Sequence, residues 1–229
     1  MTVAVQSPLL IFIPGGPGLL SDSIADLLPH FSRHDYICAD PIDDGGKLGY
    51  ENLLGQLEVL LPRDRDVVLC GHSFGGILAG DMALRTEGVK ALICMASPFS
   101  KRAWESVGDQ YNRNATPDLE SASELFERDP NDTNFRNWIA NYGVLYFAPT
   151  NVGRGKEMLL NCKTNLKAFE ESGAEASQKQ YVLQNLKTLS IPKLFIAGDA
   201  DQLVTVESAR AEAEIGGFDL VEIENAGHF

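Results

Sequence analysis

Short apolar runs separated by segments of helix length are the feature that most restricts how this chain can fold. The runs occupy positions 9–13, 36–39, 67–70, 89–95, 194–197 and 220–223. Runs of this length without strict polar alternation are typical of strands that are covered on both faces of a parallel sheet. The sequence therefore predicts an α/β fold with a mostly parallel, doubly wound sheet and right-handed crossovers.

The gaps between the first runs carry helical patterns. Ser21 and Ser23 are candidate caps for a helix in which Ile24, Leu27 and Leu28 recur at helical spacing. In the next gap, leucines recur with the same period before Pro62, at positions 53, 54, 57, 60 and 61. Each gap is therefore predicted to form one helix.

This rhythm is interrupted between positions 98 and 190, where no comparable apolar run occurs. We expect a helical insertion there, called the cap below, between a first core part (1–97) and a second core part (191–229). Cap helices are expected at 121–128, 134–142 and 156–171, separated by the breakers Asp129-Pro130, Ala148-Pro149 and Gly153. Ahead of position 9 there is room for one short strand, at 3–5.

Charge and cysteine content exclude several classes of protein. The chain has 19 Lys and Arg against 32 Asp and Glu, a formal net charge of −13, which disfavours binding to nucleic acid or to an anionic membrane surface. The apolar run at 9–13 is too short for a signal core or a membrane span, so a cytoplasmic protein is expected. The 4 cysteines form no CxxC pair and are expected to be reduced. No cofactor or metal is expected.

The most informative motif is Gly71-His72-Ser73-Phe74-Gly75, placed where an expected strand turns directly into an expected helix. A serine at such a turn is held at a strained backbone conformation, and the flanking glycines are needed because a Cβ there would clash. This arrangement, a nucleophile elbow, exposes the serine hydroxyl at the carboxyl edge of the sheet. Ser73 is therefore the candidate nucleophile.

An attacking serine also needs backbone N–H groups that stabilise the oxyanion. The Phe74 N–H, at the start of the expected helix, is one candidate. The second is the Gly16 N–H, in the glycine-proline loop 14–18 that follows the first strand. A plain turn between strand and helix is the alternative interpretation of this loop.

A base and an orienting acid are expected after the serine, in that chain order. Asp201 follows the strand at 194–197 and His228 follows the strand at 220–223, both at the edge of the sheet that holds Ser73. Asp199 is the alternative acid, although its position directly after Gly198 favours use in the turn. The remaining histidines fit less well: His30 and His34 flank a helix end, and His72 is expected to point away from the site.

With these motifs in place, the sequence resembles the α/β-hydrolase superfamily along nearly its whole length. It is closest in motif to proline-iminopeptidase-related and esterase-like members. The former have an oxyanion loop His-Gly-Gly-Pro-Gly, of which this chain has Gly15 to Gly18 with Pro14 in place of the histidine. Its elbow, Gly-His-Ser-Phe-Gly-Gly, is similar to those of esterase, C–C hydrolase and haloperoxidase relatives rather than to the iminopeptidase Gly-Gly-Ser-Trp-Gly.

Two departures from the resemblance concern the ends of the sequence. Relatives usually begin with a two-strand hairpin, where this chain has room for one strand. They also continue beyond the histidine into a helix, whereas only Phe229 follows His228 here. A base so close to a chain end is expected to be held loosely, at a cost in activity.

The resemblance implies a serine hydrolase that acts on a small acyl substrate, an ester or a related compound, through an acyl-enzyme on Ser73. An aminopeptidase is one alternative, for which cap acids would bind a cationic N-terminus. The acids at 120, 124, 127 and 129 fit a solvated helix face equally well. A non-catalytic protein that binds a ligand in the cap pocket is the other alternative. The sequence does not indicate an oligomeric state.

Overall fold

The structure is a computed structural model that describes residues 7–229, and it confirms the α/β fold. The strand expected at 3–5 lies outside the described residues. Six strands form one sheet in the order β2-β1-β3-β4-β5-β6, and every neighbouring pair is parallel. The strands are β1 (Leu9–Ile13), β2 (Tyr36–Cys38), β3 (Val67–His72), β4 (Val89–Met95), β5 (Lys193–Gly198) and β6 (Asp219–Ile223).

The strand order places the switch in direction between β1 and β3. From β1 the chain first moves outward to β2, then crosses back to β3 and continues in the opposite direction to β6. The loops that leave β1 and β3 therefore diverge at the carboxyl edge of the sheet, which is where open α/β sheets bind their ligands. The loop 14–18 and Ser73 both lie at this point.

One face of the sheet is covered by four helices and holds the main core. The helices are α1 (Tyr50–Val59), α2 (Phe74–Arg85), α9 (Gln180–Leu186) and α10 (Val206–Gly216). Strand residues such as Ile11, Leu69 and Phe195 are fully buried against them. Each such side chain contributes about 1.5–3 kcal/mol through burial. These contacts fix the sheet edge that carries the site.

The other face carries two short 3-10 helices, η1 (Ser21–Ile24) and η2 (Leu28–Phe31), in place of the single helix that was expected. The prediction that Ser21 and Ser23 cap the first turn of a helix is wrong. The backbone N and the Oγ of Ser21 both donate to the Asp40 carboxylate, at 2.7 Å each, and the Ser23 Oγ donates to the Leu20 carbonyl. Pro29 has no N–H for a continuous helical ladder, which explains the break.

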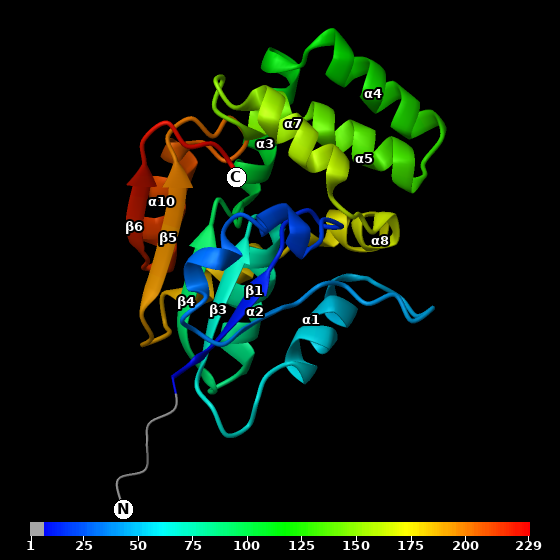
Figure 1. Ribbon diagram of the computed structural model, residues 1–229. Coiled ribbons are helices and arrows are strands. Elements are labelled where there is room, and N and C mark those ends of the chain that lie inside the picture. Colours follow the sequence, from blue (N-terminus) through cyan, green and yellow to red (C-terminus); the bar gives the residue numbers. More distant parts are fainter. Residues whose placement is uncertain (1–6) are drawn as a thin grey trace, which may run out of the picture.

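Helices fill the region between β4 and β5, and Figure 1 shows α4, α5 and α7 beyond the edge where the strands end. Besides α9, they are α3 (Lys101–Asn114), α4 (Pro117–Arg128), α5 (Asp132–Asn141), α6 (Gly143–Tyr146), α7 (Val152–Asn161) and α8 (Leu166–Ala176). In several of them a backbone N–H of the first turn donates to the side chain of the residue before the helix. These residues are Ser100, Thr116, Asn131 and Asn165. None of the helices in the part of the chain that the structure describes has the length and apolarity to cross a bilayer.

Three details of the cap differ from the sequence prediction. The helix expected at 156–171 is divided into α7 and α8, because the Asn165 N–H donates to the Gly18 carbonyl and the Asn165 side chain caps α8. Gly153, expected to be a breaker, lies inside α7, where a Cβ would meet no atom within 4 Å. Helix α3 was not expected at all.

Candidate active site

Ser73 stands at the junction of β3 and α2 with φ 52° and ψ −121°, outside the regions that most residues adopt. Its backbone N–H donates to the Met95 carbonyl of β4 at 2.7 Å, so the turn is anchored to the sheet. A Cβ on Gly71 would overlap the Gly75 carbonyl, and a Cβ on Gly75 would overlap the Ile13 carbonyl. The spacing of the glycines therefore follows from the sharpness of the turn.

Asp201 and His228 lie in contact, although 27 residues separate them in the chain. His228 Nδ1 is 2.8 Å from Asp201 Oδ2, and each residue is only 4% exposed. The other oxygen, Asp201 Oδ1, accepts the backbone N–H groups of Leu203 and Val204 at 2.8 and 2.9 Å. The carboxylate is therefore fixed, and it holds the His228 ring with Nδ1 as donor and Nε2 free to accept a proton.

The other candidate acid, Asp199, has a different position. It is exposed, and its Oδ1 accepts the backbone N–H of Asn225 at 2.7 Å, which ties the loop after β5 to the loop after β6. Of the two aspartates, the structure thus places Asp201 against His228 and Asp199 in the turn.

The backbone of His228 is also held, in contrast to the expectation of a loose chain end. Its N–H donates to the Tyr146 carbonyl at 2.5 Å, and its carbonyl lies 2.7 Å from His72 Nε2. The Tyr146 ring stacks on the His228 imidazole, with centroids 5.2 Å apart. The expectation failed because these contacts come from distant segments, α6 and β3.

Ser73 and His228 line one cavity of about 370 Å³ between the sheet edge and the cap. Within the described residues, no hydrogen bond joins Ser73 Oγ to His228, and such bonds are often long before a substrate is bound. Cap and core contribute an aromatic wall, formed by Trp104, Trp138, Tyr142, Tyr146, Phe169 and Phe229. The cavity therefore offers a predominantly apolar surface beside a serine and an imidazole.

The loop after β1 approaches Ser73 closely. A Cβ on Gly15 would lie 3.1 Å from the Ser73 Cβ, and Gly16, with φ +118°, lines the same cavity as Ser73. In the part of the chain described, the backbone N–H groups of Gly16 and Phe74 have no hydrogen-bond acceptor. Two unpaired donors beside a serine are what an oxyanion requires.

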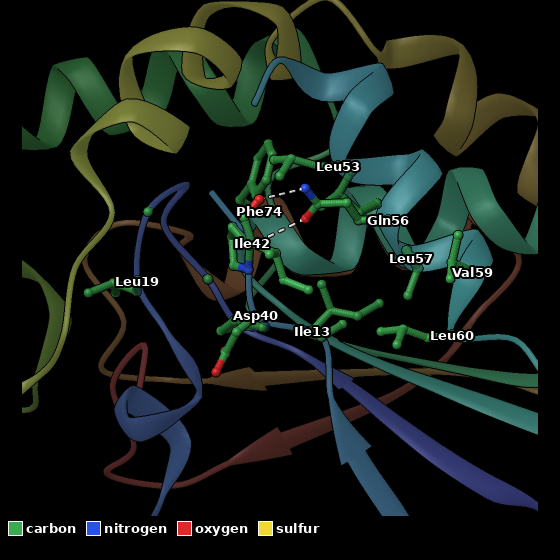
Figure 2. A pocket seen from close by; sticks show the side chains of 16 residues that line it. Ile13, Leu19, Asp40, Ile42, Leu53, Gln56, Leu57, Val59, Leu60 and Phe74 are labelled. Carbon is green, nitrogen blue, oxygen red and sulfur yellow. Dashed lines mark hydrogen bonds between the residues drawn. The ribbon is translucent and has the colours of Figure 1, made fainter. Parts of the chain in front are cut away.

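The Phe74 side chain points the other way, so only its backbone is available to the site. Figure 2 shows this ring at a different cavity, of about 170 Å³, between α1 and the loop after β2. There the backbone N–H of Ile42 donates to Gln56 Oε1 at 2.9 Å, and Gln56 Nε2 donates to the Ile42 carbonyl at 2.8 Å. Neither Ser73, Asp201 nor His228 lines that cavity.

Sequence reasoning missed two residues of this neighbourhood, His72 and Tyr146. His72 is 4% exposed, and burial, together with the nearby His228, lowers its pKa to about 3. Burial raises the pKa of Tyr146 well above its usual range. His72 stands directly before the serine, but the direction of its ring depends on the chain end that packs against it. No local pattern could have indicated the role of Tyr146.

The comparisons with known proteins agree with the fold. Residues 10–229 match the model of the Alpha/beta hydrolase family, so the chain belongs to this family of hydrolases. A search of curated protein sequences found no match.

Several solved structures share the architecture at low identity. MenH from S. aureus is 18% identical, with a TM-score of 0.69 over 99% of this chain and 88% of that chain. A thermophilic esterase from Thermogutta terrifontis is 16% identical, with a TM-score of 0.66 over 97% and 83%. The putative non-heme bromoperoxidase BpoC from Mycobacterium tuberculosis H37Rv is 16% identical, with a TM-score of 0.70 over 97% and 85%. At this identity the likeness concerns the fold. None of these three structures is described as an iminopeptidase, so the resemblance to that branch stays a prediction.

Proposed function

We propose that the protein is a serine hydrolase in which Ser73, His228 and Asp201 form a catalytic triad. The observation that carries the proposal is the 2.8 Å contact between Asp201 and His228, on the wall of the cavity that Ser73 also lines. The contact leaves Nε2 of His228 as the acceptor on the far side of the ring. An imidazole held in this tautomer is suited to take the proton of a serine hydroxyl.

In the proposed reaction, His228 Nε2 takes the Ser73 Oγ proton while Oγ attacks the substrate carbonyl. The resulting oxyanion is stabilised by the backbone N–H groups of Gly16 and Phe74. The imidazolium returns its proton to the leaving group, which departs as an alcohol or amine and leaves the acyl-enzyme. Water, deprotonated by the same imidazole, then releases the acid and restores Ser73.

The apolar and aromatic walls of the cavity favour a small acyl substrate with an apolar or aromatic group. Such a substrate would be an ester or a related compound. The acids that an aminopeptidase would use for amine binding, at 120, 124, 127 and 129, are exposed and line no part of this cavity. One observation favours the aminopeptidase alternative: Glu170, an exposed carboxylate of α8, does line it. We rank ester hydrolysis ahead, because a solvated carboxylate binds an amine weakly. A cytoplasmic location remains a prediction.

A fluorophosphonate probe tests the proposal directly, because it forms a bond only with an activated serine. We expect stoichiometric labelling of the intact protein at Ser73 and none of the Ser73→Ala variant. Absence of labelling would favour the ligand-binding alternative. Parallel assays with short p-nitrophenyl esters and with prolyl-naphthylamide then separate ester hydrolysis from aminopeptidase action.

A further inference from the structure

We propose that His72 is a positioning residue, which fixes the backbone of the catalytic base by donating its Nε2–H to the His228 carbonyl. This inference rests on the proposed function, in which His228 is the base. The two atoms are 2.7 Å apart, in a buried environment. Sequence reasoning placed His72 outside the site, whereas its ring lines the cavity of Ser73.

The direction of this hydrogen bond follows from the chemistry of the partners. A carbonyl oxygen can only accept, so Nε2 of His72 must carry the proton. His72 Nδ1 is buried without a partner in the described part of the chain, and it faces Gly15, where a Cβ would lie 2.7 Å away. A neutral ring with its single proton on Nε2 satisfies the His228 carbonyl and leaves only an acceptor unpaired.

Burial keeps His72 in this neutral form. Removal from water, with the neighbouring His228 as the second cause, lowers the pKa of His72 to about 3. Over the pH range in which a hydrolase works, the residue therefore neither gains a charge nor exchanges tautomers through protonation. A donor that does not change state is suited to positioning and not to proton transfer.

His72 connects the centre of the sheet to the segment around His228. It is the last residue of β3 and pairs with Met95 of β4 in the centre of the sheet. Its ring packs against the rings of His228 and Phe229, with centroids 4.9 and 4.6 Å apart. Asp201 holds the side chain of His228, while His72 holds its carbonyl, so both ends of the residue are fixed relative to Ser73.

Two substitutions separate the donor from the ring. His72→Phe keeps an aromatic ring but removes the donor, whereas His72→Gln provides an amide N–H near the position of Nε2. We expect His72→Phe to lower kcat about tenfold to a hundredfold with KM within about threefold, since small misplacements of a catalytic group have effects of this size. His72→Gln should recover most of kcat. His30→Phe, at an exposed site on η2, is the matched control and should change neither constant.

A measurement on the unmodified protein keeps the test decisive if a variant fails to fold. In ¹⁵N-histidine NMR spectra, His72 should be the Nε2–H tautomer from pH 5 to 9. A Nδ1–H tautomer would overturn the inference, because Nε2 could not then donate to a carbonyl. Equal kcat in His72→Phe and the parent would overturn it too, as would equal loss in the Phe and Gln variants.

These outcomes are distinct from failure of the proposed function. If the fluorophosphonate probe does not label Ser73 in the unmodified protein, the serine hydrolase proposal fails whatever tautomer His72 adopts. If Ser73 is labelled and only the His72 results are contrary, the triad stands and the positioning role is rejected.

Discussion

The sheet edge and the cap hold their residues by different means. At the sheet edge, backbone and carboxylate hydrogen bonds fix Ser73 and Asp201, at 2.7 Å to Met95 and at 2.8 and 2.9 Å to Leu203 and Val204. In the cap, aromatic rings pack together, such as Phe126 and Trp138 with centroids 5.1 Å apart. Hydrogen bonds are directional and packing is much less so. Substitutions at the edge should therefore affect rate, and those in the cap should affect substrate preference.

The largest effect is expected at the serine. Ser73→Ala should reduce kcat at least about a thousandfold, because it removes the proposed nucleophile. The melting temperature should change little, since Ser73 Oγ makes no hydrogen bond to any described residue. Ester turnover and thermal unfolding are measured on the same preparation, with Ser32→Ala, at an exposed position, as the control. Activity within tenfold of the parent would reject Ser73 as nucleophile.

The acid should come next. Asp201→Asn should lower kcat by up to about ten-thousandfold, because an amide no longer stabilises the imidazolium or selects the required tautomer. Asp199→Asn is the matched control and should have a minor effect on rate, as Asp199 contacts Asn225 and not His228. Steady-state kinetics of both variants provide the test. The reverse ranking would move the acid of the triad to Asp199.

A smaller and different effect is expected in the cap. Phe169→Leu shortens one wall of the cavity, so KM for a bulky aromatic ester should rise about tenfold while kcat stays within about twofold. The KM for an acetyl ester should hardly change. If kcat falls instead, packing in the cap determines the catalytic geometry, and the contrast between the two regions does not hold.

The junction between core and cap provides a prediction about pH. Glu212 of α10 is buried and accepts the backbone N–H groups of Phe99 and Ser100, just ahead of α3. Burial raises the pKa of Glu212 to about 7 from 4.5. The folded protein thus keeps a proton that the unfolded chain releases, and this difference adds to the free energy of unfolding. The contribution of Glu212 is complete below pH 4.5 and is lost as pH rises through 7.

Denaturant unfolding between pH 4.5 and 8 measures this contribution. The pKa difference between 7 and 4.5 sets an upper bound of about 3 kcal/mol on the contribution of Glu212 to the free energy of unfolding. Glu212→Gln should make the curve flatter over the same range, because the amide does not titrate. A parent whose unfolding free energy rises steadily from pH 5 to 8 would contradict the assignment.

The sequence predicted the parts of the fold and site that depend on short stretches of chain. The strands and the turn at Ser73 follow from apolar runs and from glycine spacing, which are local properties. The positions of His72 and Tyr146 could not be predicted, because each depends on the path of the segment around His228. The prediction that Ser21 caps a helix was wrong for the same reason. Asp40 lies in another loop, and its carboxylate accepts the hydrogen bonds that Ser21 donates.

Helix α6 adds a consequence for engineering of this protein. Although α6 lies in the cap, its Tyr146 carbonyl accepts the His228 N–H and its Leu145 carbonyl accepts the Gln202 N–H, beside Asp201. A Cβ on Gly227 would overlap the same Tyr146 carbonyl, so the segment that follows β6 and α6 have complementary surfaces. A chimera that exchanges the cap for that of a relative must therefore retain residues 145–147, or it will replace the backbone contacts that hold His228, the proposed base, together with the walls of the cavity.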